Sequence, residues 1–170
     1  MADDTQASRE GNWLPLESNP DVLNPFVRRL GLPADWAFCD VFGLDEELLC
    51  MVPQPCVAVC LLYPSAKISQ PRRAAQRLAA SQQPPPPPEL VFVMQKDGIG
   101  NACGTLACVH AIANGHVAGH FQLADGPLSE FLGQTAQLDP AGRGDALLRA
   151  TKLQEMSDST AAAGETAGAG

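Results

Sequence analysis

The chain has 170 residues and a formal net charge of −8, from 11 basic and 19 acidic side chains. This length is typical of a single domain, and a 45% share of hydrophobic residues is enough to build a core. The acidic balance argues against nucleic acid or an anionic membrane as a partner.

Neither end of the chain carries the pattern of a packed element. Residues 1–11 are polar, and residues 157–170 hold no large apolar side chain, so disorder is predicted for both segments.

The sequence contains no apolar run of the roughly 18 residues that a membrane span needs. The first residues also lack the features of a signal peptide, so a soluble cytoplasmic protein without a membrane partner is predicted.

The cysteines are predicted to be free thiols, because a reducing compartment disfavours disulfides. None of them forms a C-x-x-C pair, and their spacing to His116 and His120 is not diagnostic of a zinc site. No metal and no cofactor are therefore predicted. The six are Cys39, Cys50, Cys56, Cys60, Cys103 and Cys108.

The first elements are a short strand and a helix. Residues 13–16 are apolar around a proline, which suits an edge strand. Asn19 is expected to cap a helix that begins at Pro20 and ends at Gly31, with Pro25 bending its first turns. A further short helix is expected over residues 45–49.

Two continuous apolar runs, Val57–Tyr63 and Leu90–Met94, predict buried strands. Runs of this length with β-branched residues are typical of strands that are covered on both faces. Such strands need neighbouring strands and covering layers, so we expect an α/β (α+β) sheet flanked by helices.

Residues 67–89 form an Arg/Pro-rich insertion between these two runs. A short helix through Arg77 and Leu78 is expected, followed by the five prolines of Pro84–Pro88, which favour polyproline II. We interpret the tract as a spacer loop, and the alternative is a ligand for a polyproline-binding domain of the SH3 or WW type.

The segment Gly98–Leu106 sets Cys103 at the first turn of a helix, behind a glycine-rich approach. Asn101 is a favoured N-cap, which places Cys103 at the second helical position, and Asn114–Gly115 supplies the stop. The free N–H groups and the positive dipole end of such a helix favour an anionic sulfur. The alternative is that Cys103 is a small core residue.

Two helices are expected in the rest of the chain. The first covers residues 128–132 behind Pro127, and the second runs from Asp139-Pro140 toward Met156. No further convincing strand follows.

Several segments match one protein family in order and kind. They are Gly100–Thr105 and Val109–Asn114, preceded by 13–20, 30–32, 40–44, 48–49 and 51–53. Together they resemble the ubiquitin carboxyl-terminal hydrolases, the papain-like cysteine deubiquitinases. The resemblance covers a partial domain at residues 12–156, apart from the insertion at 67–89. It implies the N-terminal part of a papain-like knotted sheet flanked by helices, with the later strands missing.

The resemblance implies a thiol hydrolase that cleaves thioester, ester or amide bonds at the C-terminal glycine of ubiquitin, with Cys103 as the nucleophile. It also implies a glutamine that stabilises the oxyanion six residues before the cysteine, where this chain has Asp97. Gln95 lies eight residues before Cys103 and takes this role only if the loop bulges, which its two glycines permit.

The resemblance implies ubiquitin or a ubiquitin-like protein as the partner. The residues that correspond to part of the surface that the family presents to ubiquitin are Leu14, Pro15, Leu16 and Asp40.

The family's catalytic histidine and aspartate would lie farther downstream than this chain extends. His110 is on the same helix as Cys103, about 10 Å along its axis, which is beyond hydrogen-bond reach. His116 and His120 lack the strand context of the family's histidine. We therefore expect weak or no activity from this truncated form, and the alternative is a non-catalytic ubiquitin-binding or regulatory fragment.

Overall fold

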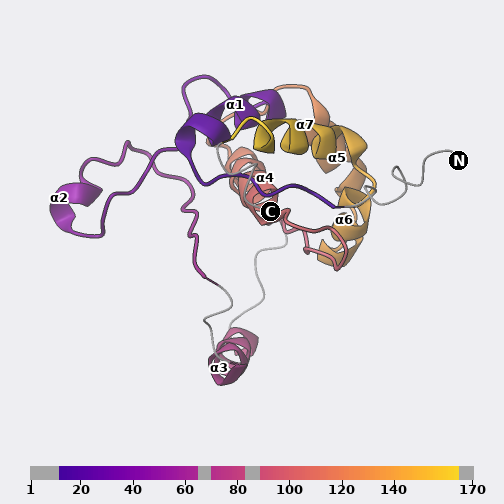
Figure 1. Cartoon of the computed structure of the whole chain (residues 1–170), viewed down its shortest axis with the longest axis horizontal. Helices are drawn as coiled ribbons and strands as arrows, with labels where there is room; N and C mark the ends of the chain where they lie inside the picture. The colour runs from indigo at the N-terminus through magenta and orange to yellow at the C-terminus, as the bar shows by residue number, and fades with distance from the viewer. Residues whose placement is uncertain (1–11, 65–69, 83–88, 165–170) are drawn as a thin grey trace, which may run out of the picture.

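The structure, a computed structural model, describes residues 12–64, 70–82 and 89–164. Its regular elements in these residues are helices (Figure 1). In chain order they are α1 (Pro20–Leu30), α2 (Glu46–Leu49), α3 (Gln70–Ser81), α4 (Cys103–Val117), α5 (Pro127–Thr135), α6 (Pro140–Leu147) and α7 (Thr151–Ala161). The Pro84–Pro88 tract lies outside the described residues.

Helix α1 begins and ends as its sequence predicts. The Asn19 side chain accepts a hydrogen bond from the Asp21 amide at 2.9 Å, and Gly31 ends the helix in the left-handed region at φ 105°. Beyond this end, the Arg28 guanidinium donates to four backbone carbonyls, those of Leu32, Pro33, Ala34 and Trp36. One arginine thus ties the helix to the chain that follows it.

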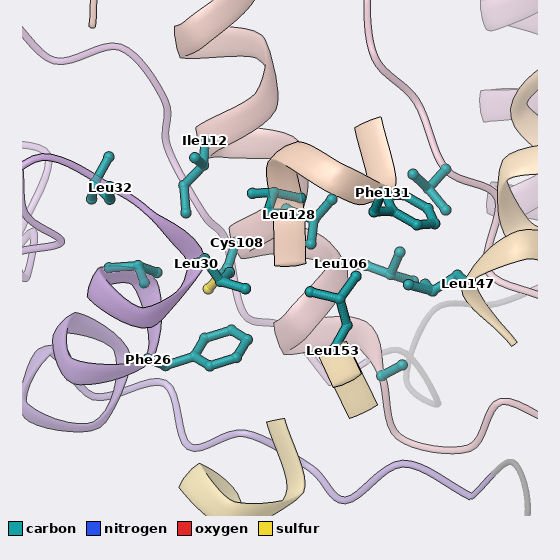
Figure 2. Packing of buried hydrophobic residues seen from close by; sticks show 14 of the residues in the cluster. Phe26, Leu30, Leu32, Leu106, Cys108, Ile112, Leu128, Phe131, Leu147 and Leu153 are labelled. Carbon is teal, nitrogen blue, oxygen red and sulfur yellow. The ribbon is translucent and has the colours of Figure 1, made fainter. Parts of the chain in front are cut away.

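Helix α4 supplies the centre of the hydrophobic core. Its buried residues include Leu106, Val109 and Ile112, and they pack with side chains of α1, α5, α6 and α7. Figure 2 shows this arrangement, with Phe26 and Leu30 of α1 on one side of α4 and residues of α5, α6 and α7 on the others. Helix α2 buries none of its residues and lies outside this bundle (Figure 1).

The predicted α/β fold is wrong for the described residues, which contain no sheet. Their β-pairing is confined to one isolated parallel bridge between Trp13 and Gly100. Val57–Tyr63 is extended but unpaired, and its side chains are largely exposed, with Val59 at 77% and Leu61 at 79%. A ladder requires hydrogen bonds to a second strand, and this run forms none in the part of the chain that the structure describes.

The second predicted strand is extended but pairs with a helix. Val91 and Val93 are buried, whereas Phe92 between them is 48% exposed, which is the alternation of a strand. Their backbone groups bond to side chains of α4 rather than to a second strand. The buried strand of a sheet that the apolar run predicts here is therefore wrong for the described residues.

The helix expected from Pro140 toward Met156 is divided into α6 and α7. Leu147 and Leu153 are both buried in the core, at 0% and 2% exposed. On one straight helix these side chains would point about 120° apart, so the break lets both of them face the core. Helix α7 then continues to Ala161, into the segment for which disorder was expected, and it buries Ser157 and Ala161.

Helix α4 also runs farther than expected, to Val117 instead of ending at Asn114–Gly115. The left-handed glycine beyond its end is Gly119, at φ 79°. Gly115 instead lies inside the helix, where the ring of Phe121 covers it. No helix in the described ranges is long and apolar enough to cross a membrane.

Alanine should have opposite effects on stability at two of the helical glycines, Gly115 in α4 and Gly133 in α5. A Cβ at Gly115 would lie 2.7 Å from two ring carbons of Phe121, whereas nothing lies within 4 Å of one at Gly133. We expect G115A to lower the free energy of unfolding by about 1–3 kcal/mol through overpacking. G133A should raise it by about 0.5–1 kcal/mol, because alanine loses less conformational entropy on folding. Urea denaturation of both variants tests this, and stabilisation by G115A would contradict the packing described above.

Candidate active site

Cys103 is the first residue of α4 and its side chain is exposed. The residue before it, Ala102, occupies the N-cap without a side-chain hydrogen bond. The helix thus begins one residue later than the sequence pattern predicts, and the N–H groups of its first turn have no acceptor within the helix. Such a turn favours negative charge, and it is the feature that suits this position to thiolate chemistry.

The chain approaches this turn through Gly100, whose φ of 73° is in the left-handed region. The side chain of Asn12 occupies the space that a Cβ at Gly100 would need. The positive φ favours glycine at this position, whereas the exposed Asn12 side chain could move aside.

The segment that begins at Trp13 holds the approach in place. The Trp13 amide donates to the Ile99 carbonyl at 3.0 Å, and the Asn101 amide donates to the Trp13 carbonyl at 3.1 Å. Farther along, Leu16 lies against Gly104, where a Cβ would be 3.0 Å from that of Leu16. Residues 13–16 were expected to form an edge strand, and they serve as a strap across the start of α4.

Helix α7 supports the strap and the first turn of α4 from the other side. The Leu14 amide donates to the Asp158 carboxylate at 2.8 Å. One residue earlier in α7, the Ser157 hydroxyl pairs with that of Thr105 at 2.7 Å inside the core. Sequence reasoning missed both α7 residues, and a polar Thr105 within an apolar helix is the one signal that pointed to such a bond.

Gln95 lies at the start of the loop that leads to Cys103. Its side chain is exposed, and its Nε2 donates to the Gly100 carbonyl at 3.2 Å. The carboxamide thus closes the loop onto its own end, and its second N–H is available for another acceptor. Asp97, at the position where the resemblance implies a glutamine, is exposed in the same loop.

The residues considered for ubiquitin binding fall into two surface regions. Leu14 and Pro15 are exposed on the strap, and Leu16 is half-buried and lies against Gly104 in the turn of Cys103. Asp40 is exposed on the segment before α2, and it is followed by Phe42 at 72% and Leu44 at 85% exposure. No described contact joins Asp40 to the Cys103 turn.

The three histidines are engaged away from Cys103. His110 Nε2 accepts a hydrogen bond from the Val93 amide at 2.9 Å. His116 Nδ1 accepts one from the Leu123 amide at 3.2 Å, and the ring of His120 lies 6.3 Å from that of Trp36. In the described part of the chain, no imidazole bonds to the Cys103 sulfur.

The second cysteine of α4 differs from the first in its surroundings. Cys108 is buried in the core, and this burial, with the nearby Cys60 adding to it, raises the pKa of its thiol to about 12. A thiol in that state is a packing group at neutral pH. Among the described residues, no group of three or more histidine, cysteine or acidic side chains is arranged to hold a metal ion.

His110 and Asn114, one turn apart on α4, bind the extended backbone at residues 91–93. The Asn114 side chain accepts from the Val91 amide at 2.8 Å and donates to the Val91 carbonyl at 2.9 Å. His110 accepts a hydrogen bond from the Val93 amide, and its ring stacks on that of Phe92 with 5.0 Å between centroids. The sequence pattern placed His110 on this helix and Asn114 at its stop, and it predicted neither of these contacts.

Comparison with known proteins gives one family. The model of the ubiquitin carboxyl-terminal hydrolases, family 1, matches residues 13–169. Similar proteins are a probable ubiquitin carboxyl-terminal hydrolase of Dictyostelium discoideum, 37% identical over 91% of this chain, and ubiquitin carboxyl-terminal hydrolase 3 of Arabidopsis thaliana, 40% identical over 98%. A ubiquitin carboxyl-terminal hydrolase of Aplysia californica is 44% identical over 79%. The chain spans 60%, 70% and 59% of the lengths of these three relatives, respectively.

The burial of His110 predicts a loss of stability in acid. Burial holds the pKa of His110 below its ordinary value of 6.5, so the unfolded chain takes up a proton at higher pH than the folded chain does. The contribution of this residue is therefore complete above pH 6.5 and is lost as the pH falls toward the lowered pKa.

Glutamine at position 110 keeps an acceptor and cannot titrate. We expect H110Q to lose less stability than the wild type between pH 7.5 and pH 5, by urea denaturation, while H120Q at an exposed histidine keeps the wild-type slope. If the unfolding free energy of H110Q falls with pH as steeply as that of the wild type, His110 is not the source of the loss of stability in acid.

Proposed function

Because the chain belongs to family 1 of the ubiquitin carboxyl-terminal hydrolases, we propose that it acts as a thiol hydrolase at the C-terminal glycine of ubiquitin, with Cys103 as the nucleophile. The observation that carries this proposal is the exposed thiol of Cys103 on the first turn of α4, braced by the strap and by α7. A nucleophile needs both access for the substrate and a fixed direction, and this turn provides both.

In the proposed reaction, the Cys103 thiolate adds to the carbonyl carbon of the terminal glycine. The bond to the leaving group then breaks, the leaving group takes a proton, and a thioester remains on the sulfur. Water hydrolyses this thioester and regenerates the thiol. The helix turn stabilises the thiolate, and an aimed donor stabilises the oxyanion of each tetrahedral intermediate by about 3 kcal/mol.

We assign the oxyanion donor to Gln95. Its hydrogen bond to the Gly100 carbonyl holds the carboxamide across the loop, and one N–H is left to donate. Asp97 is excluded from this role, because a carboxylate would repel the developing charge.

We further propose that this chain forms the covalent adduct more readily than it turns over. Proton transfer to the leaving group and activation of water both require a positioned acid and base. His110 and His116 accept hydrogen bonds from backbone amides, and the ring of His120 lies near that of Trp36. A non-catalytic ubiquitin-binding fragment is therefore the second candidate, and the same engagement of the histidines favours it.

The partner surface combines the strap residues Leu14, Pro15 and Leu16 with the region around Asp40. There the exposed apolar side chains of Phe42 and Leu44 adjoin acidic residues, so the surface suits an apolar patch rimmed by basic groups. Ubiquitin is the partner that the family indicates. We place the protein in the cytoplasm, where its unpaired cysteines would stay reduced.

The nucleophile is tested with ubiquitin that carries a vinyl methyl ester at its C-terminus. We expect the wild type to gain the mass of one ubiquitin and C103S to gain none, because serine lacks the nucleophilic thiolate. C50S, which removes another exposed cysteine, is the matched control and should react like the wild type. Failure of the wild type to react would overturn the proposed hydrolase, and a fluorogenic ubiquitin amide then measures whether turnover follows the adduct.

The partner surface is tested by charge reversal at Asp40. We expect D40K to weaken ubiquitin binding about two- to fivefold in a titration of labelled ubiquitin, since an exposed ion pair contributes about 0.2–1 kcal/mol. The effect should shrink as salt is added. D125K, at an exposed aspartate before α5, gives the same change of net charge and should bind like the wild type. If both variants weaken ubiquitin binding equally, Asp40 is not part of the surface that binds ubiquitin.

A further inference from the structure

Loop 95–100 carries Gln95, and its two ends are fixed by different parts of the chain. Trp13 bonds to its C-terminal end, as described above. Its N-terminal end lies against α6. Within the loop, Ile99 is buried in the core and its amide donates to the Lys96 carbonyl at 3.3 Å, whereas nothing lies within 4 Å of where a side chain at Gly98 would begin. The contacts with α6 are thus the ones that act on the end of the loop that carries Gln95.

Three contacts join α6 to the start of this loop. The Met94 amide donates to the Pro140 carbonyl at 2.9 Å. Lys96 Nζ forms an ion pair with Asp145 Oδ1, also at 2.9 Å. Between them, Gly144 lets the two segments approach closely, because a Cβ there would collide with the Met94 carbonyl and lie 3.0 Å from Lys96 Cε.

The ion pair of Asp145 with Lys96 differs from the other one in the described residues. The Lys96 side chain is 25% exposed and lies against Gly144 of α6, whereas the Asp145 side chain is 51% exposed, so the difference between the two pairs lies in the lysine. Lys152 and Glu130 also pair at 3.1 Å, but their side chains are 71% and 54% exposed, and they join α7 to α5 at the surface. An exposed pair of that kind does little to hold a segment in place. A packed lysine has less freedom to move, so its ion pair restrains the backbone that carries it.

We propose that Asp145 is a positioning residue, which through Lys96 holds loop 95–100 in the shape that presents Gln95 beside the Cys103 turn. The inference rests on the proposed function, in which Gln95 donates to the oxyanion. Asp145 would touch neither substrate nor thiol. Its effect on the reaction arises because a small displacement of an aimed donor has a large effect on rate.

The test uses three variants of the full chain and two measurements. D145N removes the charge with little change of shape, the reversed pair K96D/D145K restores the attraction, and E130Q breaks the surface pair as a control. The first measurement is the rate of adduct formation with the ubiquitin vinyl methyl ester, and the second is hydrogen exchange of the amides of residues 95–100. We expect D145N to slow the adduct about tenfold and to speed exchange in the loop. The reversed pair should recover both, and E130Q should change neither.

The two measurements separate this inference from the function on which it rests. If the wild type forms no adduct, the proposed hydrolase fails, and exchange still decides whether Asp145 holds the loop. Faster exchange confined to residues 95–100 in D145N supports the assignment. Unchanged exchange there, or faster exchange throughout the chain in D145N, overturns it.

Discussion

Two side chains of α4 provide the hydrogen bonds that the extended backbone at residues 91–93 would otherwise seek from a neighbouring strand. Asn114 binds both polar groups of Val91, and His110 binds the amide of Val93. The chain then returns to the first turn of the same helix at Cys103. The loop between these points is thus attached to one rigid element at both ends, and the contacts of the strap and of α6 refine a position that α4 has already set.

The elements that could be predicted from the sequence are those with local signals. Asn19 and Gly31 bound α1 through their own backbone and side-chain chemistry, whatever surrounds them. A sheet has no such local signal. The run at residues 57–63 has the composition of a buried strand, but composition records a preference for burial and does not show that a second backbone is present to pair with it.

In the candidate site, too, the parts with local signals could be predicted and the parts from distant segments could not. The glycines and the helix start that surround Cys103 are neighbours in the sequence, and their pattern locates the thiol to within one helical position. The groups that brace it come from far away: Asp158 binds the Leu14 amide across 144 residues, and Ser157 meets Thr105 across 52. Pairings at such separation leave almost no trace in a single sequence, apart from a polar residue where an apolar helix would not require one.

The exposed run at residues 57–63 also determines how the protein behaves at high concentration. It holds seven consecutive residues without a charge or a proline, and segments of this kind join edge to edge between molecules. The net charge of −8 opposes such contacts, because every molecule repels every other. Salt screens that repulsion and leaves the pairing of backbones intact. We therefore expect the solubility of this chain to depend on its net charge and to decrease as ionic strength rises.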